Sequence, residues 1–378
     1  MPGRKQKEQP EQNTTLSRRM MMAGLLSGFY SFARLPTARA AAEPPTPLIV
    51  AGVADSQCGQ WASLLAPILA DELQYASPFP LTTTTGWDGV TGANLFETQQ
   101  EQALPPAGVI APGTAILAAL AGDSRVHYDY QRWVPTFLSH QSTVVVGKAA
   151  LHRSVASILK GQPLRVGVSR YTGPELPTLL ALDLLGLRPL PLPGFGTAEA
   201  ALQALRAGTV DVIQLPFDVD FSGRMAALQE EGFLPLFSNA LPNSPFLRQG
   251  LPLDFTTVFA QERHRAPNAL LYQAWAATAT ATAIKAGLML PILSLPATVA
   301  QWRHACQKAA ATHDLRVHAR EENQIMLTGT VCASTYATMM PDLSVMLALR
   351  RWLAFNMPRW RDTAARPLSP AAAQQHAD

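Results

Sequence analysis

Short apolar segments alternate with amphipathic segments over most of the chain, and this alternation constrains the fold more than any other feature. Between the first two apolar segments, Trp61, Leu65 and Leu69 recur at helical spacing and predict a helix that packs on a core. Strands that alternate with helices in this way predict α/β layers. The segments that fit strands are residues 48–51, 108–111, 143–146, 164–168, 190–193 and 210–213.

Longer segments with helical spacing fill much of the remainder. A chain of 378 residues, 48% of them hydrophobic, can bury a large core, and its length favours two domains. Residues 268–284 are uncharged but rich in Ala and Thr, so we interpret them as part of a buried helix and not as a membrane span. The tail from residue 366, rich in Ala, Pro and Gln, is expected to be disordered. Helices are expected at residues 154–160, 198–205, 267–290, 299–312 and 345–356.

The N-terminus has the pattern of an export signal. Arg18 and Arg19 precede an apolar stretch over residues 20–32, and small residues suited to cleavage follow, up to Ala42. The paired arginines indicate the twin-arginine route, and the apolar stretch is shorter than the roughly 20 residues that span a bilayer. We therefore predict a signal peptide over residues 1–42, cleaved after Ala40 or Ala42, and a periplasmic, soluble mature protein.

Charge and cysteine content narrow the function classes. Residues 1–42 carry seven Lys and Arg against two Glu, and the remaining chain has 23 basic and 25 acidic side chains. This balance offers no basic face for a nucleic acid. The three cysteines, Cys58, Cys306 and Cys332, are expected to be small buried residues, and whether the last two pair stays open.

Several loops share one geometry, in which a strand ends in small polar residues and a helix then begins. Helix N-termini present free N–H groups and a partial positive charge, and both favour anions. Ser56, Thr114, Ser169 and Thr197 add hydroxyl groups at such places, and Arg170 adds a guanidinium that can pair with a carboxylate. Loops of two lobes that converge in this way predict a site for a small carboxylate.

Five motifs follow one another along the chain: the helix at 61–73, residues 88–94 (DGVTGAN), 128–135 (YDYQRWVP), 191–197 (PLPGFGT) with 208–211 (GTVD), and 241–245 (LPNSP) with 250–252 (GLP). In this order they resemble motifs of the tripartite tricarboxylate transporter receptors, also called Bug-type solute-binding proteins. The resemblance covers roughly residues 48–260. In the first loop, Gly59 stands where the family has an acidic residue, and Asp55 lies at the other end of that loop.

The resemblance implies a type II periplasmic-binding-protein fold. Two doubly wound α/β lobes would be joined by two crossing strands, with the ligand in a cleft between them. Lobe 1 would comprise residues 43–146 and 257–365, and lobe 2 residues 147–256. Closure of the lobes on the ligand is implied as well.

The resemblance also implies a set of ligand-binding residues, carried over by position from the family's loops. Family ligands are mono-, di- and tricarboxylates, some amino acids and nicotinate-like acids, and the partners are two membrane permease subunits. No cofactor is implied, and we expect a monomer. The implied residues are Asp55, Ser56, Gln57, Cys58, Gly59, Thr91, Gly113, Thr114, Ser169, Arg170, Tyr171, Thr172, Gly173, Phe195, Gly196, Thr197 and Gln214.

Three other functions are kept open. An enzyme could use Cys58, since a thiol at a helix N-terminus can become a nucleophile. A metal or redox site could draw on His304, Cys306, His313 and His318, although their spacing is not that of a zinc or haem motif. A binding protein of the same fold could also serve a sensor and not a transporter.

Overall fold

The computed structural model describes residues 45–100, 102, 105–148, 163–241, 250–263, 267 and 269–365. The chain divides into residues 1–40 and 41–378, and every described residue belongs to the second unit. The predicted signal peptide, the helix expected at 154–160, residues 242–245 of the fifth motif and the tail from residue 366 lie outside the described residues.

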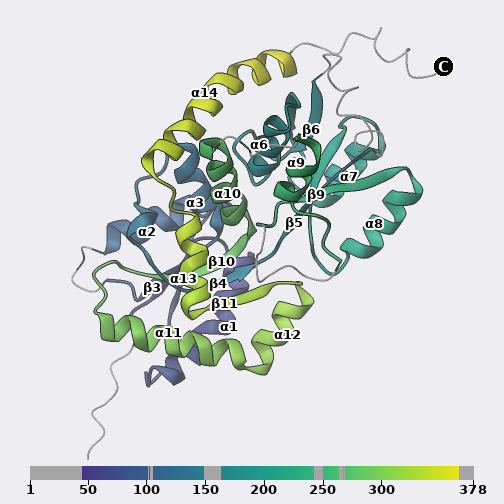
Figure 1. The fold of residues 1–378 in the computed structure, drawn as a ribbon. Helices are drawn as coiled ribbons and strands as arrows, with labels where there is room; N and C mark the ends of the chain where they lie inside the picture. The colour runs from purple at the N-terminus through teal and green to yellow at the C-terminus, as the bar shows by residue number, and fades with distance from the viewer. Residues whose placement is uncertain are drawn as a thin grey trace, which may run out of the picture. The chain divides into compact units, whose positions relative to one another are not determined.

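The first sheet has six strands in the order β11-β4-β10-β3-β1-β2 (Figure 1). β1 pairs in parallel with both β2 and β3, and β10 runs antiparallel between β3 and β4. The inner strands β1 and β3 are buried and are continuous apolar runs, whereas β4 also contains the buried polar residues Thr136, Ser139 and His140 and β10 contains Lys285. The strands are β1 (Leu48–Val50), β2 (Leu81–Thr83), β3 (Gly108–Ala111), β4 (Val134–His140), β10 (Ile284–Leu290) and β11 (Ile325–Thr328).

The second sheet has five strands in the order β7-β6-β8-β5-β9. β6 is parallel to β7 and β8, and β5 runs antiparallel to β8 and β9. We call the part built on the six-stranded sheet lobe 1 and the part built on this sheet lobe 2. Its strands are β5 (Thr143–Lys148), β6 (Leu164–Val168), β7 (Pro189–Pro193), β8 (Val212–Pro216) and β9 (Phe233–Ser238).

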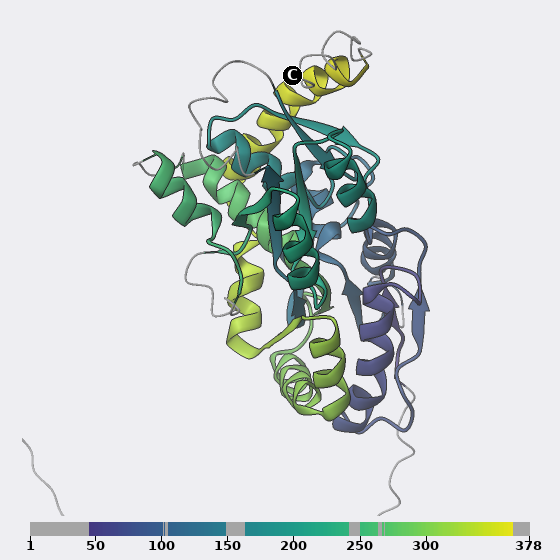
Figure 2. The same cartoon turned by 90° about the vertical axis from the view of Figure 1, so that its right-hand side faces the viewer.

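Helices pack on both sheets; in lobe 1, for example, α1 lies beside α11 and α12 (Figure 2). Among the described residues, no helix combines the length and the apolar character needed to cross a membrane. The helices are α1 (Gln57–Glu72), α2 (Val90–Gln99), α3 (Gly113–Ala121), α6 (Leu176–Leu184), α7 (Ala198–Arg206), α8 (Phe221–Glu230), α9 (Phe255–Arg263), α10 (Ala269–Ala283), α11 (Pro296–Ala311), α12 (His313–Glu321), α13 (Gly329–Thr338) and α14 (Leu343–Ala365), with a 3₁₀ turn at Tyr130–Arg132.

The chain passes between the sheets twice. It moves from β4 to β5 across residues 141–142, and it returns from β9 through α9 and α10 to β10. The chain therefore enters the second sheet at Thr143, before the lobe boundary that was expected between residues 146 and 147. The limits of the two lobes as separate folding units stay predictions.

One sequence-based prediction is wrong in its second half. Residues 267–290 were expected to form one helix, but the helix α10 ends at Ala283 and residues 284–290 form the strand β10. The apolar run has no period that separates a buried helix from a buried strand. Pairing with β3 on one side and β4 on the other decides the outcome, because tertiary context overrides local propensity.

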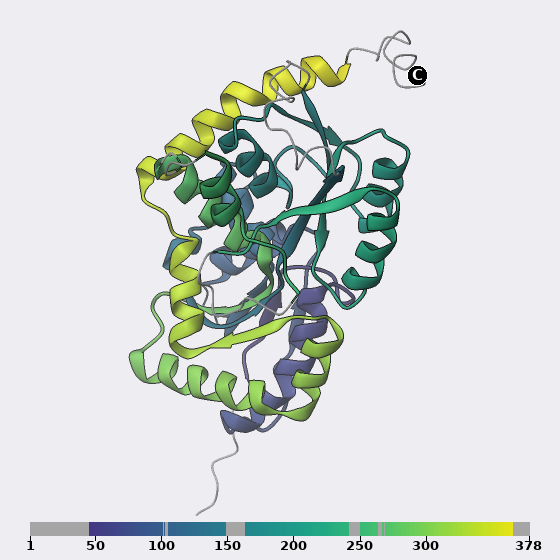
Figure 3. The ribbon, with the colours of Figure 1, turned by 45° about the vertical axis from the view of Figure 1, so that its right-hand side comes forward.

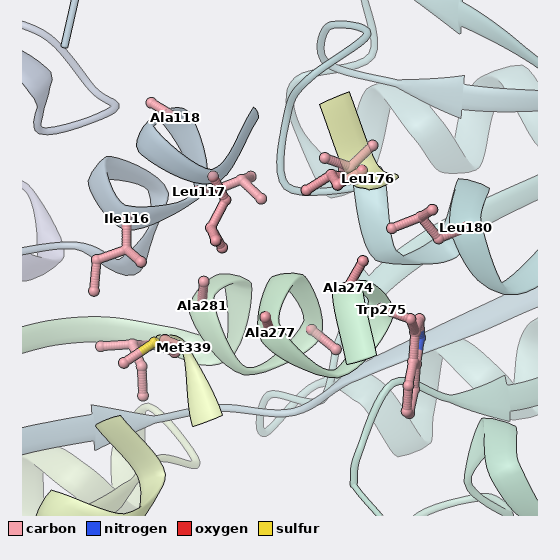
Figure 4. Close-up of a cluster of buried hydrophobic side chains, with 14 of the residues drawn as sticks. Ile116, Leu117, Ala118, Leu176, Leu180, Ala274, Trp275, Ala277, Ala281 and Met339 are labelled. Carbon is pink, nitrogen blue, oxygen red and sulfur yellow. The ribbon is translucent and has the colours of Figure 1, made fainter. Parts of the chain in front are cut away.

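The helix α10 lies between α3 of lobe 1 and α6 of lobe 2 and contacts both (Figure 4). Its small residues Ala277 and Ala281 allow the neighbouring helices to approach closely, and the ring of Trp275 packs on Phe255 with the ring centroids 4.7 Å apart. These residues belong to one cluster of buried hydrophobic side chains. A core of this kind joins the lobes through packing and not only through the two chain crossings.

The long helix α14 contacts α3, α10 and β7 and so connects elements of both lobes (Figure 3). Arg350 donates hydrogen bonds to carbonyls in the last turn of α3. Further along α14, the indole of Trp352 donates to Asp183 in α6 at 2.8 Å, and that of Trp360 donates to the carbonyl of Pro189 at 2.9 Å.

The contact between α3 and α10 predicts the effect of a small substitution. A Cβ added at Gly113 would overlap with the backbone carbonyl of Ala281, so we expect Gly113→Ala to lower the free energy of unfolding by about 1–3 kcal/mol. Gly223, exposed on α8 with nothing near its Cβ position, is the control; Gly223→Ala should raise stability by up to about 1 kcal/mol. Urea unfolding measures both, and equal effects would contradict the predicted overlap.

Candidate functional site

A cavity of about 340 Å³ lies at the carboxyl ends of β1 and β3, where α1 and α3 begin. This is the edge at which open α/β sheets place their ligands. Most of its walls come from lobe 1. The lining residues are Ala51, Gly52, Asp55, Ser56, Gln57, Cys58, Gly86, Trp87, Pro112, Thr114, Pro174, Thr282, Ile284 and Lys285.

The N-terminus of α1 forms one wall. Ser56 caps this helix: its Oγ accepts a hydrogen bond from the Gly59 amide at 3.2 Å and donates one to the Val53 carbonyl at 2.6 Å. The amides of Gln57 and Cys58, which follow the cap, have no hydrogen-bond acceptor within the described chain. Two free N–H groups and the positive end of a helix therefore lie at this wall.

The N-terminus of α3 lies on the same edge. Pro112 precedes the helix and, like Thr114 in its first turn, lines the cavity. The Thr114 hydroxyl donates to the Asp88 carbonyl at 3.1 Å, so it is committed to holding the neighbouring loop. Residues 57–59 and 113–114, which were expected to lie in loops, form first turns of helices.

Lys285 places a cationic side chain at the same cavity. It stands on β10 in the middle of the first sheet and is only partly exposed. Its ammonium has no hydrogen bond or ion pair in the described chain, and Asp218 and Glu175 act on it only from longer range. Burial lowers the pKa of Lys285, and the two carboxyl groups partly oppose that effect. A partly buried ammonium without a counter-charge favours the arrival of an anion.

Cys58 contributes a neutral wall. It is buried, and its Sγ donates a hydrogen bond to the backbone carbonyl of Lys285 at 3.3 Å. Burial raises the pKa of the Cys58 thiol far above its usual range, so the group is a thiol and not a thiolate at neutral pH. Cys306 and Cys332 are also buried, as the sequence predicted, and both are free thiols, which settles the pairing that the sequence left open.

Gln57 is held in place from behind. Its side-chain amide donates to Glu322 at 3.0 Å and accepts from Gln324 at 2.6 Å. Gln324 accepts in turn from the buried indole of Trp61 at 2.9 Å. The neighbouring Asn323 donates to a carbonyl of lobe 2, that of Phe217, at 2.7 Å. The first turn of α1 is thus fixed to the β11 side of lobe 1, and that side touches lobe 2.

A second contact between the lobes lies in the loop between β2 and α2. Asp88 of this loop accepts hydrogen bonds from Arg125 of lobe 1 at 2.7 Å and from Arg170 of lobe 2 at 3.1 Å. Burial alone would raise the pKa of Asp88, but the two arginines and the Val90 amide lower it below its usual value. Arg170, expected to pair with a ligand carboxylate, is engaged with Asp88, and its ligand role stays a prediction.

The loop of lobe 2 that precedes α6 brings only Pro174 to the cavity among the described lining residues. Ser169 donates from its amide and its hydroxyl to the partly buried Glu175, at 3.1 and 2.8 Å. Gln214 donates to the Pro174 carbonyl at 3.1 Å. These two predicted site residues therefore support the loop and do not line the cavity.

The other predicted residues divide into two groups. Asp55, Ser56, Gln57, Cys58 and Thr114 line the cavity together. The remainder do not line the cavity. Gly59 and Gly113 pack against backbone, Tyr171 stacks on Trp360, and Thr197 caps α7. The other predicted residues that are absent from the lining are Thr91, Thr172, Gly173, Phe195 and Gly196.

Sequence reasoning missed three lining residues with informative signals. Lys285 is a single charged residue inside an otherwise apolar strand, and charged side chains are rarely buried unless they are paired. Trp87 lies between glycines in a loop, away from any apolar stripe. Pro174 directly follows the predicted loop at 169–173. His304, Cys306, His313 and His318 do not come together, and no group of three or more His, Cys, Asp or Glu residues in the described ranges could hold a metal ion.

The pairing at Asp88 predicts how the lobes respond to loss of one arginine. Arg170→Ala removes the pair that crosses between lobes, so we expect open conformers to become up to about fivefold more populated, the limit for a partly exposed ion pair. Single-molecule energy transfer between dyes on Glu72→Cys and Glu230→Cys, both exposed, measures the lobe separation.

Arg125→Ala is the matched control for this measurement. Arg125 binds the same carboxylate from within lobe 1, so its loss should leave the distribution of lobe distances unchanged. Identical distributions for Arg170→Ala and the unaltered protein would mean that the ion pair does not hold the lobes together.

Comparisons with known proteins bear on the fold. No protein-family model matches the chain, and no curated protein matches its sequence. Among solved structures, a TctC solute binding protein from Polaromonas is 14% identical, with 81% of this chain and 98% of that chain covered and a TM-score of 0.58.

Two further solved structures are more distant. MatC from Rhodopseudomonas palustris with bound malate is 17% identical over 85% of this chain and 99% of that chain, with a TM-score of 0.46. The periplasmic binding protein BugD is 14% identical over 81% and 96%, with a TM-score of 0.48. TM-scores below 0.5 are too low to support an inference about this chain. The likeness to the Polaromonas protein confirms the predicted fold: the chain has the two-lobe α/β fold of a TctC-type solute-binding protein.

Proposed function

We propose that this protein is a periplasmic receptor that binds a small carboxylate in the cavity at the α1 and α3 N-termini. The fold of a solute-binding protein supports a binding role, and the export signal predicted over residues 1–42 supports the periplasm. The family motifs in the sequence support a tripartite transporter as the destination of the ligand. Two membrane permease subunits would then be transient partners.

The observation that carries the proposal is the set of positive groups at one wall. The amides of Gln57 and Cys58 and the ammonium of Lys285 all lie at this cavity, and none of them has an acceptor in the described chain. A carboxylate is small, planar and anionic, and its two oxygens can accept from backbone amides and an ammonium together. A neutral sugar would leave the charge of Lys285 unpaired.

A receptor that presents its ligand to a sensor is the alternative within the same fold. The geometry of the cavity is equally suited to both destinations. Genes for a large and a small permease subunit beside the gene of this protein would favour transport, and a neighbouring sensor gene would favour signalling.

A thermal-shift screen tests the carboxylate proposal directly. A ligand that binds only the folded protein raises its melting temperature, by an amount that grows with concentration. We expect hits among small carboxylic acids and none among neutral sugars. A panel in which only sugars or metal ions stabilise the protein would contradict the proposal.

Lys285→Met separates binding from stability. The substitution removes a partly buried charge that lacks a partner, so we expect the ligand-free protein to become more stable by about 1 kcal/mol. Affinity for carboxylates should fall at least about tenfold, the effect of losing one charge-assisted hydrogen bond. Urea unfolding and titration calorimetry measure the two effects, and Lys308→Met, exposed on α11, is the matched control.

The pH dependence adds a second readout to the same variant. Because the pKa of Lys285 is lowered in the folded protein, the unfolded chain binds more protons between the lowered and the ordinary value. Stability of the ligand-free protein should therefore rise with pH in that window, while carboxylate affinity falls as the ammonium loses its proton. Lys285→Met should abolish both trends; if they persist unchanged, Lys285 does not contact the ligand.

An enzyme that used Cys58 as its nucleophile would need a reactive thiol there, whereas we expect the Cys58 thiol to be unreactive. With the thiol buried and its pKa raised, we expect no alkylation of the native protein by iodoacetamide at neutral pH, and labelling only after unfolding. Cys58→Ala should bind carboxylates within about twofold of the unaltered protein, because the backbone amide remains. Rapid labelling of one thiol in the native state would reopen a catalytic role.

A further inference from the structure

Trp87 differs from the other tryptophans of the chain. All seven tryptophans lie in the described residues, and Trp87 alone is mostly exposed, with 79% of its surface accessible. It also lines the cavity. A single exposed apolar residue is ordinary on a protein surface, but one at the mouth of a cavity with anion-binding groups is a candidate for contact with a ligand.

Trp87 has no partner for its ring or for its indole N–H among the described residues. Each of the other six packs on a second ring. These pairs are Trp61 with Phe137, Trp133 with Phe96, Trp275 with Phe255, Trp302 with Phe79, and Trp352 with Trp360. The face of Trp87 is therefore available to a molecule in the cavity.

The backbone that carries Trp87 is nonetheless held firmly. Gly86 and Gly89 adopt left-handed conformations, with φ of 97° and 78°, which few other residues accept. Between them, Asp88 accepts from two arginines through its carboxylate and from Thr114 through its carbonyl. The loop thus fixes the backbone of Trp87, whereas no packing of its ring on another ring of the described residues explains the exposed position of the side chain.

The other walls of the cavity indicate what would lie beside Trp87. Ala51, Pro112, Pro174 and Ile284 offer apolar surface, and Lys285 is the one cationic side chain among the described lining residues. A second carboxylate on the ligand would find no second cation here, and Asp55 would repel it. The cavity therefore suits one anionic group attached to an apolar body.

We propose that Trp87 is a specificity-determining residue: its indole stacks on the flat, apolar body of a monocarboxylate whose anionic group is bound by Lys285 and the α1 N-terminus. This inference rests on the proposed carboxylate-binding function and adds the class of acid to it. Offset stacking between two aromatic groups gives a favourable contact beyond the burial of area alone. An aromatic ring therefore binds better than a saturated ring of the same size.

Three acids separate the contributions of charge, size and planarity. Benzoate has one carboxylate and a flat ring, cyclohexanecarboxylate has the same charge on a puckered ring, and succinate has two carboxylates and no ring. Titration calorimetry on the full chain should rank benzoate first. Trp87→Ala should weaken benzoate at least about tenfold and the other two acids less, whereas Trp87→Phe, which keeps an aromatic face, should retain most of the affinity.

The design includes a control and a direct spectroscopic signal. Leu293→Ala removes an apolar side chain that is 87% exposed and does not line the cavity, so it should leave all three affinities unchanged. Tryptophan emission should shift when benzoate binds, because Trp87 leaves water, and Trp87→Phe should lose most of that shift. If Trp87→Phe loses affinity for benzoate but keeps the shift in tryptophan emission, the stacking role is overturned.

The outcomes distinguish this inference from the function on which it rests. If no acid binds the unaltered protein, the carboxylate function fails and this inference fails with it. If acids bind but Trp87→Ala weakens benzoate and succinate equally, or weakens neither, the function stands and the role of Trp87 is overturned. A preference for succinate over benzoate overturns it as well.

Discussion

The packing of α10 against α3 is the contact on which the rest of the site depends. Gly113 at the start of α3 lies so close to the Ala281 carbonyl that no larger residue fits between them. This approach fixes the α3 N-terminus beside the end of α10, and the chain then continues directly into β10. Thr282, Ile284 and Lys285 therefore reach the cavity from the same segment that fills the core between the lobes. The cavity and the interlobe core therefore share one continuous stretch of chain.

The contacts between the lobes are of two kinds. The core around α10 is buried and mainly apolar, and α14 binds α3 through Arg350 and binds α6 and β7 through indole hydrogen bonds. On the cavity side, the contacts are polar and few: Arg170 with Asp88, and Asn323 with the Phe217 carbonyl. A partly exposed ion pair contributes less than about 1 kcal/mol, so it can break on a fluctuation. Strong packing on one side and weak polar contacts on the other is the arrangement expected of a hinge that opens toward the cavity.

Much of the fold followed from the sequence because its strands are short and clearly bounded. Residues 108–111 and 164–168 form strands with the limits predicted from their apolar pattern. The strand β10 was missed because an apolar run carries no period when both faces are buried, and only its two neighbours in the sheet decide its form. At the site, the α1 N-terminus was predictable from Ser56 and the strand before it. The contact of Arg170 with Asp88 and that of Cys58 with the Lys285 carbonyl were not predictable, because each joins residues more than 80 positions apart in sequence.

Charge and shape have separate roles in this cavity. Under the proposed function, backbone amides and one ammonium would attract any carboxylate, and their attraction would barely distinguish one acid from another. Discrimination must therefore come from the groups that touch the remainder of the ligand, where an unpaired charge or an unfilled apolar wall weakens binding. Asp55 disfavours a second anion, and the exposed ring of Trp87 favours an apolar surface of matching shape. Backbone donors can be supplied by many different sequences, whereas discrimination requires particular side chains, so under the proposed function the choice among carboxylates rests on Trp87 and Asp55 and not on the groups that bind the charge.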